Sequence, residues 1–169
     1  MTSATDNPEP VDKYLTKEVT DQRVIGPLPM GVAALVHISR FGVIPKRHQP
    51  GKWRLILDLS SPKGRSVNDG IDKNLCSLQY ESVDNTARII MGLGRDTQLA
   101  KIDIAHAYRN VPVHPADRYL LGMQWKGKIY IDTALPFGLR SAPKIFCALS
   151  DTLEWILLQA GISVPVLPR

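Results

Sequence analysis

The chain has 169 residues, of which 44% are hydrophobic and 22% are charged. This balance is typical of a folded globular protein and excludes a disordered chain, and the length suits one domain or part of a larger one. No apolar run reaches the roughly 18 residues that a membrane span needs, so no membrane association is predicted. The polar, acidic N-terminus is not a secretory signal.

Charge is distributed unevenly along the chain, whose formal net charge is +5. Residues 1–22 hold five acidic and two basic side chains, a net charge of −3. Residues 40–65 hold seven basic side chains and one acidic side chain, a net charge of +6. A local excess of this size indicates either a surface that binds a polyanion or a solvated basic hairpin, and charge alone does not decide between them.

The first elements follow from composition and apolar spacing. Prolines and small polar residues over residues 1–9 favour a disordered leader. Apolar residues at helical spacing predict a short amphipathic helix from Pro10 to about Arg23, and Gly26-Pro27-Leu28-Pro29 ends it. Two β-type runs, Phe41–Ile44 and Trp53–Leu59, flank a Pro-Gly turn and predict a hairpin with basic residues at and beside its tip.

The middle of the chain alternates between loops, helix and strand. Turn residues predict an ordered loop over Ser60–Gln79. An N-cap serine, helical apolar spacing and terminal glycines predict a helix over Ser82–Leu93. A short apolar run predicts a buried strand over Leu99–Ile104.

The last third is predicted to hold a hairpin and a long helix. Tyr119–Trp125 and Lys128–Thr133 flank Lys126-Gly127, a pair typical of hairpin turns. Ser141 opens a helix with Pro143 in its first turn and one apolar face, running to about Ala160. Because strands and helices mix without a regular βαβ rhythm, the predicted class is α+β.

The two cysteines, Cys76 and Cys147, indicate a reduced intracellular protein, cytoplasmic or nuclear. They lie 71 positions apart without a second pair, so we expect buried thiols and no zinc site. The four histidines show no ligand spacing.

Three stretches carry residues suited to chemistry, and each has two interpretations. Asp103 lies within an apolar strand, where a bound Mg²⁺ would compensate its charge; the other interpretation is a carboxylate that caps the next turn. Gly138 lies before a helix start near Lys144, which suits either a bound phosphate or a plain capped helix. On the hairpin, Arg54 with Lys46 or Arg47 grips a triphosphate or is surface charge.

The order and spacing of these stretches resemble retroelement reverse transcriptases, in particular those of LTR retrotransposons. Lys-Ile-Asp-Ile-Ala-His-Ala-Tyr (101–108) resembles the first palm motif, and Leu-Pro-Phe-Gly-Leu-Arg-Ser-Ala-Pro (135–143) resembles the second. Pro45–Arg47, followed by Trp53–Leu59, resembles the fingers. The likeness runs from about Tyr14 to Ile162, nearly the whole chain.

The resemblance implies a partial right-hand polymerase. Its fingers would cover about residues 10–97 and an incomplete palm about residues 98–162, with a divergent tail over residues 163–169. Its expected partners are an RNA or DNA template with primer and deoxynucleoside triphosphates. Its chemistry would be primer extension by two-Mg²⁺ phosphoryl transfer, in which one ion activates the primer hydroxyl and the other steadies the leaving pyrophosphate.

Family roles carry over to single positions. Asp103 would be the first catalytic carboxylate and would bind both Mg²⁺ ions, with Ile104 lending a backbone carbonyl beside the nucleotide. Tyr108 would lie under the sugar of the incoming nucleotide and exclude a 2′-hydroxyl.

The remaining roles concern the phosphates and the template. Arg54 with Arg47 or Lys46 would hold the triphosphate. Phe137 and Gly138 would contact the nucleotide and the template face.

The sequence departs from the family in its carboxylates. Family members have a Tyr-x-Asp-Asp hairpin shortly after the second-motif helix, whereas this chain reads Ser-Val-Pro-Val-Leu-Pro-Arg over residues 163–169. Asp132, in Tyr-Ile-Asp-Thr, precedes the second motif and is expected to be structural or exposed. One carboxylate holds two Mg²⁺ ions poorly, so we expect this chain to be inactive as a polymerase. We also expect modest stability, because the strands that would pair with the Asp103 strand are missing and leave an exposed sheet edge. The alternative is a non-catalytic nucleic-acid-binding remnant of the fingers.

Overall fold

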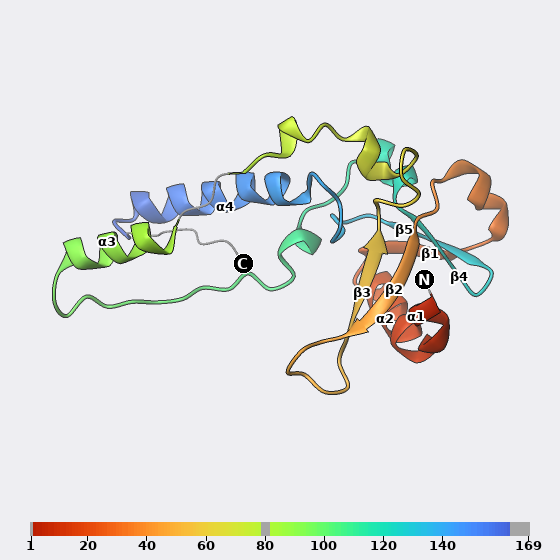
Figure 1. Cartoon of the computed structure of the whole chain (residues 1–169), viewed down its shortest axis with the longest axis horizontal. Helices are drawn as coiled ribbons and strands as arrows, with labels where there is room; N and C mark the ends of the chain where they lie inside the picture. The colour runs from red at the N-terminus through yellow and green to blue at the C-terminus, as the bar shows by residue number, and fades with distance from the viewer. Residues whose placement is uncertain (1, 79–81, 163–169) are drawn as a thin grey trace.

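Two antiparallel sheets form the centre of the computed structural model, which describes residues 2–78 and 82–162. The first sheet has the order β1 (Val24–Leu28), β5 (Lys128–Asp132), β4 (Gly122–Trp125). The second is the hairpin of β2 (Arg40–Pro45) and β3 (Trp53–Asp58), as Figure 1 shows. Helices and antiparallel strands mix without βαβ units, which confirms the predicted α+β class.

The N-terminus folds onto the hairpin, which corrects the disorder expected for residues 1–9 over the described residues 2–9. Thr2–Asp6 forms the short helix α1, and its Ala4 is only 4% exposed. The Ser3 hydroxyl accepts a hydrogen bond from the backbone N–H of Val43 at 3.2 Å, which occupies part of the outer edge of β2. The predicted helix from Pro10 is present as α2, over Pro8–Thr20.

Strand β1 was missed, because Gly26-Pro27-Leu28-Pro29 predicts a break rather than a strand. The structure pairs Val24 with Asp132 and Ile25 with Ile131, and the register shifts before Leu28. A proline is tolerated here because β1 lies at the edge of its sheet.

Short 3₁₀ turns connect the main elements and make the predicted loop over residues 60–79 an ordered one where it is described. They are η1 (Met30–Leu35), η2 (Val67–Gly70), η3 (Asn74–Cys76), η4 (Ala107–Asn110) and η5 (Pro115–Leu120). Because η5 reaches Leu120, the strand expected from Tyr119 begins only at Gly122.

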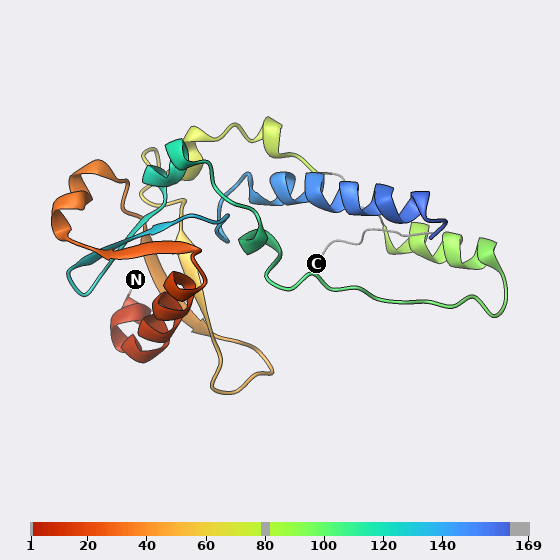
Figure 2. The ribbon, with the colours of Figure 1, turned by 180° about the vertical axis from the view of Figure 1, so that it is seen from behind.

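Two helices form a lobe that projects away from the sheets in both views (Figures 1 and 2). The predicted helices are confirmed as α3 (Val83–Leu93), capped by the Ser82 side chain, and α4 (Ala142–Gln159). The apolar face expected on α4 stays partly open to solvent, since four of its aliphatic residues are between 38% and 49% exposed: Ile145, Leu149, Leu153 and Ile156.

The buried strand expected over Leu99–Ile104 is absent. This stretch has no regular structure and belongs to neither sheet, and the side chains of Leu99 and Ile102 are 67% and 77% exposed. An extended segment becomes a strand only when a neighbour satisfies its backbone groups, and no strand in the described part of the chain lies beside it.

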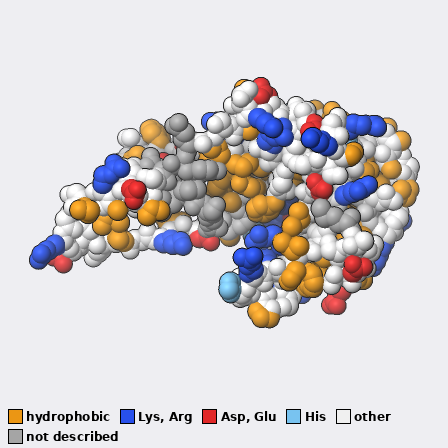
Figure 3. All heavy atoms as spheres, in the orientation of Figure 1, with side chains coloured by type: hydrophobic (Ala, Val, Ile, Leu, Met, Phe, Trp, Pro, Cys, Tyr) orange, Lys and Arg blue, Asp and Glu red, His pale blue; other side chains and the backbone are white. Residues whose placement is uncertain are grey.

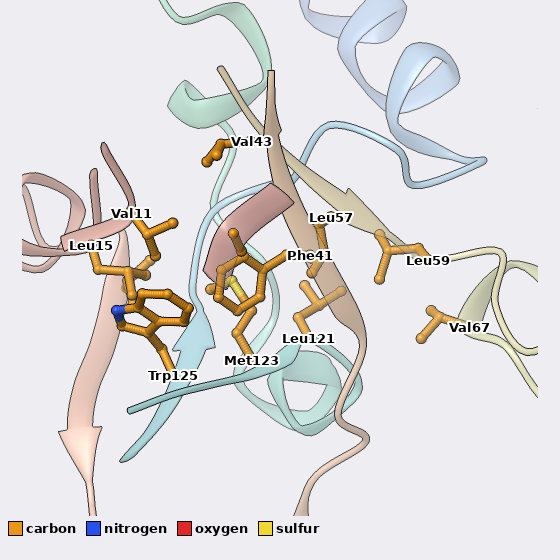
Figure 4. Close-up of a cluster of buried hydrophobic side chains, with 12 residues drawn as sticks. Val11, Leu15, Phe41, Val43, Leu57, Leu59, Val67, Leu121, Met123 and Trp125 are labelled. Atoms are coloured by element: carbon orange, nitrogen blue, oxygen red, sulfur yellow. The ribbon is translucent and has the colours of Figure 1, made fainter. Parts of the chain in front are cut away.

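The core lies where the hairpin packs on the first sheet and α2 (Figure 4). Phe41 and Trp125 meet edge to face at 5.7 Å between ring centroids, and Leu15 and Met123 are 2% and 1% exposed. Fully burying side chains of this size stabilises the fold by roughly 1.5–3 kcal/mol each. The end of the first motif at Tyr108 and the start of the second at Leu135 both adjoin this packed region.

The expectation of buried cysteines is corrected. Cys76 and Cys147 are free but half-buried, not fully buried. No helix in the described ranges is long and apolar enough to cross a membrane. The tail over residues 163–169 lies outside the described residues.

Candidate nucleic-acid interface

The two palm-like motif segments are brought together by strand pairing between the stretches that join them to the sheets. Pro112 and Ala134 form an antiparallel bridge. The N–H of Val113 donates to the carbonyl of Thr133 at 2.8 Å, and the N–H of Leu135 donates to the carbonyl of Val111 at 2.8 Å. The residues just before 111 and just after 135 consequently meet in space.

Tyr108, Phe137 and Phe146 make an aromatic cluster at this meeting point. The ring of Tyr108 lies 5.0 Å from that of Phe137 and 5.6 Å, edge on, from that of Phe146. Tyr108 is half-buried, whereas Phe137 is 52% exposed. Figure 3 shows hydrophobic side chains gathered at the surface where η4 meets the start of α4.

Gly138 lets the second motif approach the hairpin closely. Its φ is +97°, a left-handed conformation that favours glycine, and a Cβ placed there would lie 2.7 Å from the backbone oxygen of Leu57 on β3. The first motif, the second motif and the hairpin are thus in contact through Tyr108, Phe137 and Gly138.

The basic hairpin has the predicted form, and its register decides which cations share a face. Ile44 pairs with Arg54, and the N–H of Lys46 donates to the carbonyl of Lys52 at 2.8 Å. Because side chains alternate along a strand, Lys46 lies on the Arg54 face, while Arg47 lies in the turn. All three are exposed, and Figure 3 shows Lys and Arg side chains gathered on this hairpin.

Arg109, which follows Tyr108, is the centre of a buried ion-pair network that the sequence did not reveal. Its Nη2 lies 2.8 Å from Oε2 of Glu18 and 2.7 Å from Oδ1 of Asp132, and all three side chains are 5% exposed or less. Its Nη1 donates to the carbonyl of Ala134 at 3.1 Å. Arg23 adds two hydrogen bonds of 2.8 Å to the Glu18 carboxylate.

The two carboxylates respond differently to this setting. Burial raises the pKa of Asp132 to about 6, against the opposing attraction of Arg109. Burial also acts to raise the pKa of Glu18, but hydrogen bonds from Arg23 and Arg109 outweigh it and hold that pKa below its ordinary value. Of the two expectations for Asp132, structural or exposed, the structure shows the first, because its carboxylate is enclosed with Arg109.

Asp103 and Ile104 precede this anchored region. The Asp103 side chain is exposed and that of Ile104 is half-buried, on the stretch that joins neither sheet. Among the described residues no three Asp, Glu, His or Cys side chains converge as a metal-binding group. Mg²⁺ prefers near-octahedral oxygen ligands, so the described residues by themselves do not fit a two-metal centre.

Comparison with known proteins identifies a family. The family model for reverse transcriptase (RNA-dependent DNA polymerase) matches residues 44–164. The Pro-Pol polyprotein of simian foamy virus type 1 is 29% identical over 106 residues, which are 63% of this chain and 8% of that polyprotein. The Pro-Pol polyprotein of feline foamy virus is 28% identical over 115 residues, 68% of this chain and 9% of the other. The chain spans less than a tenth of either relative.

Solved structures share the fold at lower identity. The prototype foamy virus protease–reverse transcriptase aligns with a TM-score of 0.65 and 20% identity, over 96% of this chain and 19% of that one. The foamy viral protease–reverse transcriptase solved with dsDNA gives 0.64 and 23%, over 95% and 25%. The form solved with an RNA/DNA hybrid gives 0.58 and 22%, over 93% and 18%. These likenesses agree with the predicted partial polymerase fold.

The contact between Gly138 and β3 predicts a position-specific loss of stability. We expect Gly138→Ala to lower the free energy of unfolding by about 1–3 kcal/mol, because it adds both left-handed strain and a clash with Leu57. Gly127→Ala is the matched control: its φ is +70° but nothing lies within 4 Å of the added Cβ. Urea unfolding followed by circular dichroism measures both, and equal losses would contradict the close contact.

The raised pKa of Asp132 predicts a pH dependence with a definite sign. The unfolded carboxyl titrates near 3.9, so between about pH 6 and pH 4 the folded state binds the proton first and gains stability as pH falls. Between pH 7 and pH 5 the gain from this group is about 1 kcal/mol. Glu18, with its lowered pKa, opposes this only at lower pH.

Asp132→Asn isolates this effect, since it keeps an oxygen that accepts from Arg109. The free energy of unfolding is measured for the wild type and the variant at pH 7 and pH 5. The contributions of the other titrating groups cancel when the changes in the two proteins are compared. The wild type should gain about 1 kcal/mol more than the variant on acidification. A larger gain in the variant would refute the assignment.

Proposed function

Because this chain belongs to the reverse transcriptase (RNA-dependent DNA polymerase) family, we propose that it binds a template with its primer, and a deoxynucleoside triphosphate, for RNA-directed DNA synthesis. The binding surface would comprise the hairpin β2–β3 and the Tyr108–Phe137 contact. The observation that carries this proposal is that contact at 5.0 Å, with Gly138 against β3, because it unites all three family segments on one surface.

The side chains suit their proposed partners. Arg54 and Lys46 share one hairpin face, so both reach a triphosphate or backbone phosphate together, and Arg47 extends the positive surface at the turn. Phe137 offers an exposed ring for a base to stack on, and the ring of Tyr108 beneath it would meet the nucleotide sugar. The solved relatives that bind dsDNA and an RNA/DNA hybrid support this choice of ligand.

Catalysis by this chain is a separate question, since Asp103 is exposed and no metal-binding group of three is present in the described ranges. We propose that Asp103 contributes one Mg²⁺ ligand, with Ile104 lending its carbonyl, and that productive phosphoryl transfer needs additional carboxylates. The lack of such a metal-binding group among the described residues favours the second candidate function for these 169 residues, nucleic-acid binding without catalysis.

The hairpin predicts a salt-dependent affinity for nucleic acid. Replacing Lys46, Arg47 and Arg54 with Gln should weaken binding to an RNA/DNA hybrid about tenfold or more near 0.1 M salt, and should reduce the salt slope by up to about three. Fluorescence anisotropy across a salt series measures both quantities.

A triple variant with the same charge change is the control. Lys13, Lys73 and Lys128 are exposed and lie on α2, before η3 and on β5. Their replacement with Gln should change affinity little. If both triple variants weaken binding equally, only net charge matters and the hairpin assignment fails.

Primer extension tests the carboxylate proposal. The purified 169-residue protein, given an RNA template with a DNA primer, deoxynucleotides and Mg²⁺, should show no extension above background. The Asp103→Ala variant, prepared in parallel, reveals any contaminating polymerase. Template-directed extension by the wild type that the variant lacks would show that the chain is catalytic.

A further inference from the structure

Asn68 connects the second motif to the fingers, although no part of it lies at the binding surface. It belongs to η2 and is 4% exposed. Its Nδ2 donates to the carbonyl of Gly138 and to Oγ of Ser60, each at 2.8 Å, and its Oδ1 accepts the N–H of Arg140 at 2.7 Å. One buried amide thus holds the backbone on both sides of Leu139.

Arg140 closes the same junction in the opposite direction. Its Nη1 donates to the backbone carbonyl of Asn68 and, at 2.7 Å, to that of Ile71. The loop carrying Gly138 and the turn η2 are therefore joined by side chains from each partner. Because the Asn68 side chain holds the backbone of the loop and the Arg140 side chain holds the backbone of the turn, the two segments are linked by hydrogen bonds in both directions.

The turn itself is fixed independently of the loop. The N–H of Asn68 donates to the carbonyl of Leu59 at 2.9 Å, just beyond β3. Ser66 and Asp69 form a reciprocal capping box, and Asp69 also accepts the N–H of Gly64 at 2.6 Å. The backbone of Asn68 is consequently held at the end of β3 independently of the contacts that its side chain makes with the loop.

What the junction holds in place is an exposed aromatic ring. Leu135 and Pro136 are buried, yet Phe137 next to them is 52% exposed, beside a glycine in a left-handed conformation. A large apolar side chain held at the surface loses part of the stabilisation that full burial would give. The hydrogen bonds at Gly138 and Arg140 fix the backbone that carries it.

We propose that Asn68 is a positioning residue: its side-chain amide fixes the loop at Gly138 and Arg140 so that the Phe137 ring is presented for stacking on a base of the bound nucleic acid. This inference rests on the proposed function, because it explains how the Phe137 ring of the proposed nucleic-acid-binding surface is held in position. Asn68 acts through Phe137 and touches no ligand.

Fluorine NMR makes the ring directly observable, because the chain has only three phenylalanines, Phe41, Phe137 and Phe146. The protein is labelled with 4-fluorophenylalanine, and Phe137→Leu identifies its signal by loss. A DNA duplex with a single-stranded overhang is the probe. In the wild type we expect the duplex to shift the Phe137 signal and leave the signal of buried Phe41 unchanged.

Asn68→Ala should abolish the shift of the Phe137 signal on adding the duplex and weaken binding about 5- to 150-fold, the range of one base–aromatic stack. The Phe41 signal reports that the core remains folded. Ser60→Ala is the matched control, because it removes a hydrogen bond from the same amide nitrogen without touching the loop. It should retain both the shift and the affinity.

A double-mutant cycle separates positioning from general loosening. If Asn68 acts through Phe137, Asn68→Ala adds no further loss of affinity in a Phe137→Leu background. Should Asn68→Ala unfold, Asn68→Asp, which keeps the acceptor for Arg140 but loses the donor to Gly138, takes its place in every arm. If both variants unfold, or if the losses add, Asn68 is merely structural and the proposal is wrong. A wild type that does not bind the duplex would instead refute the proposed function.

Discussion

The Arg109 ion-pair network is the constraint on which the arrangement of the surface depends. Its guanidinium contacts Glu18 from α2 and both Asp132 and the carbonyl of Ala134 at the end of β5, so one side chain joins η4 to two other parts of the chain. Removing one partner of a buried ion pair costs about 3–5 kcal/mol, because the other charge remains dehydrated. Against a total stability of about 5–15 kcal/mol, that is enough to decide whether the domain stays folded.

The position of Arg109 in the chain links stability to the surface. It lies within η4 directly after Tyr108, and the stretch that follows pairs with the stretch leading to Phe137. Ion pairs and strand pairing therefore hold Tyr108 from one side, while Asn68 and Gly138 hold Phe137 from the other. The 5.0 Å contact between the rings is the product of these distant restraints and not of local preference.

Local signals predicted the elements whose stability is local. The hairpin follows from two β-type runs around a Pro-Gly turn, and α3 and α4 follow from helical periodicity and a serine at the start; their positions agree with the structure. Strand β1 was missed because its pairing with β5 spans more than a hundred residues and overrides the breaking tendency of Pro27. Arg109 was not singled out from the sequence for the same reason: its partner Glu18 lies 91 positions away.

The buried strand predicted over Leu99–Ile104 was wrong because an apolar run is buried only where another element packs against it. Regular structure resumes at η4, whose N-cap His106 adopts a left-handed conformation at φ 56°. Asp103 lies before that point and Tyr108 after it. The aromatic residues proposed to meet sugar and base are therefore held by the core, whereas Asp103 lies on a segment that belongs to neither sheet. The proposed ligand binding and the proposed chemistry thus fall on physically separate parts of the described chain, and the packing of the core supports the residues proposed for binding.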